Sequence, residues 1–138
     1  MTRGIRNCNP LNIRRTKDVW QGLRPVQTDP DFCQFVKNSY GFRAGFVILN
    51  KYMKRGWTTV AQIIEHWAPP TENHTQSYIS AVCRKTHLTP STEIDIKNEN
   101  RVVLLVWGMA WVECCFTFPI DEIYSGYRLF SRDFLRKP

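Results

Sequence analysis

Glu72 is the acidic residue whose neighbours in the sequence best suit acid–base chemistry. It follows the Pro69–Pro70 pair, comes soon after Trp67 and precedes a helical segment that carries Tyr78. A loop carboxyl group beside an aromatic side chain would be partly desolvated yet open to substrate, which suits a general acid. Glu72 could instead serve only as a negative charge near the N-terminus of the next helix, where the helix dipole favours it. Both roles stay open.

Three further acids are weaker candidates for catalysis. Asp29 and Asp31 flank Pro30, where they could supply a second carboxylate or simply stabilise a turn through Asx hydrogen bonds. Glu65 lies on the polar side of the helix expected to end at Trp67, so a solvated helix face is its alternative role. These acids complete the set of candidate catalytic residues.

The N-terminal segment that would hold some of these residues favours irregular and extended structure. Residues 1–38 are rich in turn formers, and Gln21–Gly22 resembles a turn between short strands at Val19–Trp20 and Leu23–Val26. We therefore expect a small N-terminal β-hairpin.

Beyond residue 38 the apolar residues recur at helical spacing. The period predicts five helices, at about 39–56, 58–67, 75–85, 99–115 and 120–130. Thr58 or Thr59 can cap the second of these, and Pro69–Pro70 ends it. Because there is no internal repeat or low-complexity linker, we expect one domain over 1–138, of α+β class but mainly α.

The chain has a net charge of +7, from nineteen Lys and Arg against twelve Asp and Glu. This excess suits a polyanionic partner or a plain solubilising surface. No helix-turn-helix pattern or RNA-binding aromatic signature is present, so we expect no specific nucleic-acid binding. The apolar stretch 102–118 contains Glu113, a charge that is costly inside a bilayer, so we expect no membrane span.

The five cysteines indicate reduced thiols rather than a disulfide framework. Their number is odd, no CxxC motif occurs, and no histidine has zinc-finger spacing. We therefore expect no metal and no cofactor. The N-terminus also lacks an apolar signal-peptide segment.

Four blocks of the sequence occur in the order and spacing of a phage family. The run 3–14 reads RGIRNCNPLNIR, followed by WQG at 20–22, YGFRA at 40–44, and WAPPTENHT at 67–75 with Tyr78–Ile79 behind it. Over about residues 3–88 the chain resembles the structural protein P5-like family of bacterial viruses. More distantly, it resembles the glucosaminidase and lytic transglycosylase branches of the lysozyme superfamily.

The resemblance implies a lysozyme-like fold and a phage or prophage protein that cleaves cell-wall glycan, as a lysozyme or a lytic transglycosylase does. Such cleavage needs a general acid, together with a second carboxylate or an internal nucleophile of the substrate. The alternative is a non-catalytic virion structural or cell-wall-binding protein on the same fold. The implied partners are peptidoglycan glycan strands and other virion proteins, with synthesis in the bacterial cytoplasm and association with the virion.

Several polar and aromatic residues would suit the binding of N-acetyl sugars. The asparagines could donate to the sugars, or could satisfy backbone groups of an irregular loop or cap a helix. The aromatic residues could stack on sugar rings or belong to the core. The candidate substrate-binding residues are Asn7, Asn9, Asn12, Trp20, Tyr40, Trp67, Asn73 and Tyr78.

Two departures from these families bear on activity. Cys8 stands where the phage family usually has Asn. Lysozyme-like enzymes carry their acid Glu on a helix before this segment, whereas here only Met1 to Ile5 precede it and the first acid is Asp18. Either the acid has moved to another part of the chain or the site is empty.

Overall fold

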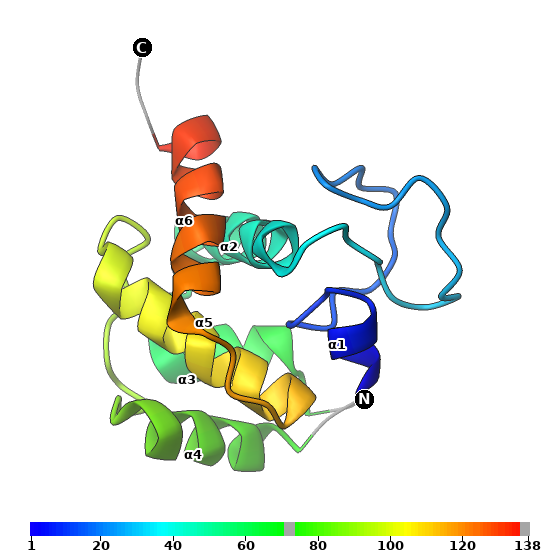
Figure 1. Ribbon diagram of the computed structural model, residues 1–138. Coiled ribbons are helices and arrows are strands. Elements are labelled where there is room, and N and C mark those ends of the chain that lie inside the picture. Colours follow the sequence, from blue (N-terminus) through cyan, green and yellow to red (C-terminus); the bar gives the residue numbers. More distant parts are fainter. Residues whose placement is uncertain (71–73, 136–138) are drawn as a thin grey trace.

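Helices make up the regular secondary structure of the described residues, which are 1–70 and 74–135 of a computed structural model. Figure 1 shows α5 between α4 and α6, with α2 crossing α6 and a long irregular segment looping away after α1. Within the described residues, no helix is both long and apolar enough to cross a bilayer. The helices are α1 (Arg3–Arg6), α2 (Asn38–Lys54), α3 (Val60–Trp67), α4 (Thr75–Thr86), α5 (Glu99–Cys114) and α6 (Ile120–Phe134).

The predicted N-terminal β-hairpin is absent, and the α+β class is wrong. The described part of the chain contains no strand and no sheet. Between α1 and α2 there are only two isolated bridges, which pair Arg14 with Phe32 and Leu23 with Phe35. Leu23 therefore lies beside a residue twelve positions further on rather than across the Gln21–Gly22 turn. The observed fold is all-helical.

The composition of the expected strands explains why no hairpin forms. Pro25 has no N–H group to donate to a ladder. Val19 and Val26, whose β-branched side chains suggested strands, are 91% and 71% exposed. A strand is stabilised by burying the apolar side chains of one face, and the side chains of these two valines are not buried.

The predicted helices after residue 38 are present. Thr59 caps α3 with a capping box, in which its hydroxyl accepts from the Gln62 N–H at 3.1 Å and the Gln62 side chain accepts from the Thr59 N–H at 3.2 Å. The short helix α1 was not predicted. Its N-cap is Thr2, whose hydroxyl accepts from the Ile5 N–H.

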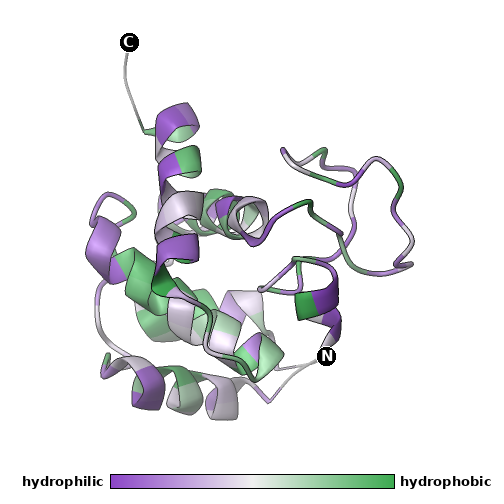
Figure 2. Ribbon diagram, in the orientation of Figure 1, coloured by the Kyte–Doolittle hydropathy of each residue, from purple (hydrophilic) through white to green (hydrophobic). Residues whose placement is uncertain are grey.

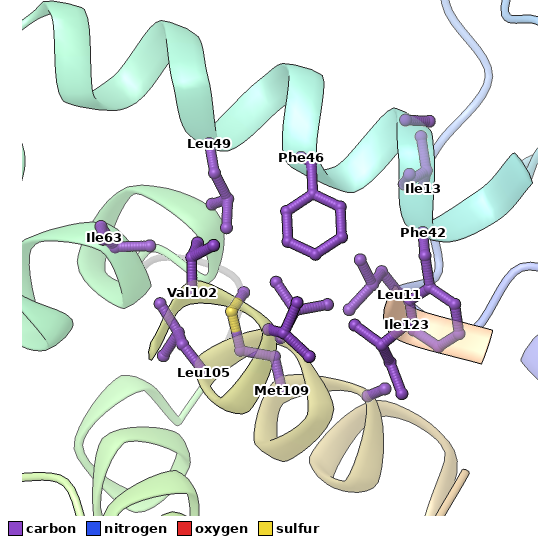
Figure 3. Packing of buried hydrophobic residues seen from close by; sticks show 14 of the residues in the cluster. Leu11, Ile13, Phe42, Phe46, Leu49, Ile63, Val102, Leu105, Met109 and Ile123 are labelled. Atoms are coloured by element: carbon purple, nitrogen blue, oxygen red, sulfur yellow. The ribbon is translucent and has the colours of Figure 1, made fainter. Parts of the chain in front are cut away.

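The core is built around α5. Figure 3 shows its buried side chains Val102, Leu105 and Met109 facing Phe46 and Leu49 of α2. In Figure 2 this helix is largely green, whereas purple predominates on outward-facing parts of α4 and α6. Each such side chain contributes roughly 1.5–3 kcal/mol when fully buried, so this layer holds the helices that position the site described below.

The α2–α6 crossing depends on a glycine. A Cβ atom at Gly126 would lie 2.5 Å from the Phe42 Cβ and 2.9 Å from the Ser39 backbone oxygen. The two helix backbones can approach this closely only because position 126 has no side chain.

The Gly126→Ala substitution should therefore destabilise the protein by roughly 1–3 kcal/mol, since the added methyl group forces the two helices apart. Urea unfolding followed by circular dichroism would measure this loss. The matched control is Ser125→Ala at the neighbouring exposed position, which should change the unfolding free energy by less than about 0.5 kcal/mol. Equal stability of the two variants would contradict this account of the crossing.

Candidate functional site

Glu113, in the last turn of α5, carries a carboxylate that accepts three side-chain hydrogen bonds. The Tyr78 hydroxyl donates to its Oε2 at 2.9 Å, and the Trp67 Nε1 donates to the same oxygen at 3.1 Å. The Asn12 Nδ2 donates to Oε1 at 3.0 Å. These donors lie on α4, on α3 and in the segment after α1, so one carboxylate joins four parts of the chain.

The surroundings of Glu113 explain why it needs these donors. The side chain is half-buried on a largely apolar helix, and the C-terminal end of a helix dipole disfavours negative charge. The three neutral hydrogen-bond donors compensate for this unfavourable placement of the negative charge. Burial first, and the nearby charge of Glu113 second, raise the pKa of Tyr78 well above its usual value. The Tyr78 hydroxyl therefore keeps its proton and remains a donor.

Glu113 lies on the wall of an open cavity of about 370 Å³, which we call the Glu113 cavity. This volume falls in the range of small-ligand sites. Four aromatic side chains line it, Trp20, Phe32, Tyr52 and Trp67. The indole Nε1 of Trp20 is buried with no hydrogen-bond partner among the described residues. The lining residues used below are Asn12, Arg14, Asp18, Trp20, Lys51, Tyr52, Trp67 and Glu113.

The structure brings together four of the predicted site residues. Asn12, Trp20 and Trp67 line the Glu113 cavity, and Tyr78 reaches the same carboxylate from the buried side of α4. Their role in sugar binding stays a prediction. Their proximity to one another is an observation.

Other predicted residues lie elsewhere. Glu72 and Asn73 fall outside the described residues. Glu65 is exposed on α3. Tyr40 packs against Gly22, where a Cβ atom would lie 2.1 Å from the tyrosine ring, and it lines a different hollow, formed partly by α6.

Asp29 is the acceptor of a buried polar cluster. Arg3 donates to its two oxygens at 2.7 and 2.6 Å, and Asn7 donates to it at 2.9 Å. Asp31 pairs with the same arginine at 3.1 Å but is exposed. Hydrogen bonding from Arg3 is the main cause that holds the pKa of Asp29 well below its usual range. Catalysis by Asp29 or Asp31 remains untested.

Asn9 organises the backbone that leads to the cavity. Its buried side chain accepts from the Ile13 N–H at 2.9 Å and donates to the carbonyls of Ile13 and Cys33 at 2.9 and 3.0 Å. These bonds take the place of a strand ladder for this segment. They fix the chain on either side of Asn12, whose amide reaches Glu113.

Glu113 is not among the candidate site residues predicted from the sequence. The charge of Glu113 served only as an argument that residues 102–118 do not span a membrane. A single carboxylate inside an otherwise apolar helical stretch could have indicated the site. When the helix is buried, such a charge needs hydrogen-bond donors from other parts of the chain. Asp18 and Tyr52 were likewise not proposed as cavity residues.

The Arg3–Asp29 pair predicts a specific pH dependence of stability. Because the folded state lowers the pKa of Asp29, the stabilisation is present above the unfolded value of about 4 and is lost as the pH falls below it. Urea unfolding between pH 7 and pH 3 should show a smaller acid-dependent loss for Asp29→Asn than for the unsubstituted chain.

Asp31→Asn is the matched control for that experiment, because it removes a carboxylate that pairs with the same arginine but is exposed. Its pH dependence should follow that of the unsubstituted chain closely. The Arg43–Asp133 pair also lowers the pKa of an aspartate and contributes equally in all three proteins. Parallel curves for Asp29→Asn and the unsubstituted chain would contradict the prediction.

Comparison with known proteins identifies a phage relative of this chain. No family model matches the chain. It is 35% identical over 129 residues to Protein P5 of Pseudoalteromonas phage PM2, an alignment that covers 91% of this chain and 79% of the phage protein. The P5-like resemblance predicted from the four motif blocks is thereby confirmed, and the chain belongs to the family of phage Protein P5.

Proposed function

We propose that this phage-family protein cleaves the glycan of the bacterial cell wall, with Glu113 as the acid. The observation that carries the proposal is the position of Glu113 on the wall of an open cavity lined by Trp20, Tyr52 and Trp67. Aromatic faces beside a carboxylic acid are suited to holding a sugar ring next to a proton donor.

The contacts of Glu113 suit proton transfer to a glycosidic oxygen. In the protonated state the acid gives its proton to the leaving oxygen and becomes a carboxylate. The hydrogen bonds from Tyr78, Trp67 and Asn12 then stabilise the charge that develops. As the leaving oxygen is protonated, its bond to the ring carbon breaks. Where the substrate supplies an internal hydroxyl nucleophile, as in lytic transglycosylases, that oxygen bonds to the ring carbon and its proton passes to the Glu113 carboxylate, so one acid suffices. Asp18, which also lines the cavity, is available where a second carboxylate is needed.

The position of Glu113 also supports an acid that has moved along the chain. In lysozyme-like enzymes the acid lies on a helix that precedes the Asn-rich segment. Here a late helix, α5, ends with a glutamate whose Oε1 accepts from Asn12 of the corresponding segment. The acid and the Asn-rich segment therefore come together here although Glu113 follows that segment in the sequence.

One observation favours a second function. Both carboxylate oxygens of Glu113 already have protein donors, as expected for a joint that holds four segments together. On that view the protein is a non-catalytic virion structural or wall-binding protein. Membership of a phage protein family supports association with the virion under either function.

Glu113→Gln should lower the rate of glycan cleavage by at least about 100-fold, because it removes the proton that the proposed mechanism gives to the leaving oxygen. The measurement is the release of soluble fragments from purified peptidoglycan. Glu93→Gln, at an exposed position outside the cavity, is the matched control and should leave the rate unchanged. Glu72→Gln tests the candidate selected from sequence in the same assay.

Folding of each variant is checked by thermal melting. If Glu113→Gln melts below the assay temperature, Glu113→Asp provides the second test, since it keeps the charge but withdraws the carboxyl group from the cavity. Full activity of a folded Glu113 variant would refute the assigned acid. A lack of activity in the unsubstituted protein on several wall types would favour the non-catalytic function.

A further inference from the structure

The Glu113 cavity is lined by two basic side chains, Arg14 and Lys51. Arg14 comes from the segment after α1, and Lys51 comes from the last turn of α2. Neither forms an ion pair with any acid of residues 1–70 and 74–135, whereas Arg3 and Arg43 are both paired. Their charges are therefore not neutralised by those acids.

Arg14 is held in place before any ligand arrives. Its guanidinium carbon lies 4.9 Å from the centre of the Phe32 ring, a cation–π distance. The backbone on either side is fixed, because the Cys33 N–H donates to the Ile13 carbonyl at 2.9 Å and the Arg15 N–H donates to the Asp31 carbonyl at 2.8 Å. A guanidinium whose position is already set loses less freedom on binding.

The two acids of the cavity leave these cations available. The carboxylate of Glu113 accepts hydrogen bonds from its three neutral donors and forms no ion pair with Arg14 or Lys51. Asp18 accepts a hydrogen bond from the Thr16 hydroxyl at 3.0 Å and lies beyond ion-pair distance of either cation. The cavity thus combines an acid already compensated by neutral groups with two cations that have no partner acid in the described part of the chain.

We propose that Arg14 and Lys51 form a carboxylate-binding subsite, and that it selects carboxylate-bearing glycans over neutral glycans with the same backbone. The inference rests on the proposed function and names its substrate class. A guanidinium presents a planar pair of N–H donors that matches a carboxylate, and an ammonium adds a second charge. A glycan made only of neutral N-acetyl sugars would offer neither cation a carboxylate.

The carboxylates of cell-wall glycan have two sources, which the experiment separates. One is the lactyl group on the muramic sugar, and the other is the peptide stem. The probes are chitotetraose, which is neutral; glycan strands freed of peptide by an amidase, which keep the lactyl carboxylate; and strands that retain their stems. Binding to the full chain is measured by tryptophan fluorescence at 4 °C.

The unsubstituted protein should bind at least one of the carboxylate-bearing probes about 100-fold more tightly than chitotetraose, about tenfold for each of the two cations. Arg14→Gln and Lys51→Gln should each remove about tenfold of that affinity, as expected for one charge-assisted hydrogen bond, and should change chitotetraose binding by less than about twofold. Lys17→Gln and Lys54→Gln are matched controls outside the cavity and should have no effect. Thermal melting checks that these four variants, all at exposed positions, are folded.

Three outcomes would overturn the subsite. Equal affinity for charged and neutral probes, or equal weakening of both by the two substitutions, would remove the selectivity while leaving the proposed function intact. Tighter binding of random duplex DNA through Arg14 and Lys51 would assign these residues to nucleic acid instead. Binding of no glycan at all would reject both the subsite and the proposed function.

Discussion

A carboxylate placed at the C-terminal end of a mainly apolar helix is the constraint on which the rest of this structure depends. The helix dipole and the partial burial both disfavour the charge of Glu113. Three neutral donors resolve this conflict, and they come from segments that are far apart in the sequence, with 101 residues separating Asn12 from Glu113. The N-terminal segment, α3 and α4 must therefore converge on the end of α5, and the wall of the cavity forms where they meet.

A buried polar cluster does for the N-terminal segment what a sheet would otherwise do. Asn7, Asp29 and Gln34 are all buried and hydrogen-bonded to one another. Asn9 binds the backbone on both sides of the segment. Because these side chains satisfy the backbone locally, the segment can follow an irregular path. That path places Asn12, Arg14 and Trp20 along one cavity.

Under the proposed function, the same contacts serve both stability and chemistry. Trp67 and Tyr78 hold the end of α5, and they are also the groups that would stabilise the charge on Glu113 during proton transfer. Selection for a stable joint therefore preserves most of a catalytic site, and selection for catalysis preserves the joint. For this reason the catalytic and structural functions share nearly all of their residues, and the basic residues Arg14 and Lys51 carry separate information about the ligand.

Local patterns were enough to predict the helices after residue 38 and the family, but not α1. Local signals were sufficient for the Thr59 capping box, the helical spacing of apolar residues after residue 38 and the ordered motif blocks of the P5-like proteins. The tertiary structure alone decided the position of the site and the absence of a hairpin. Cys8 has a φ of 48°, in the left-handed region that suits the Asn usual in the family. The turn at Cys8 could likewise not be predicted from local sequence patterns. The physical reason is the range of the interactions: helix period and capping act within a few residues, whereas the side-chain donors of Glu113, and Arg3 and Asn7 beside Asp29, are brought near only by the folded chain.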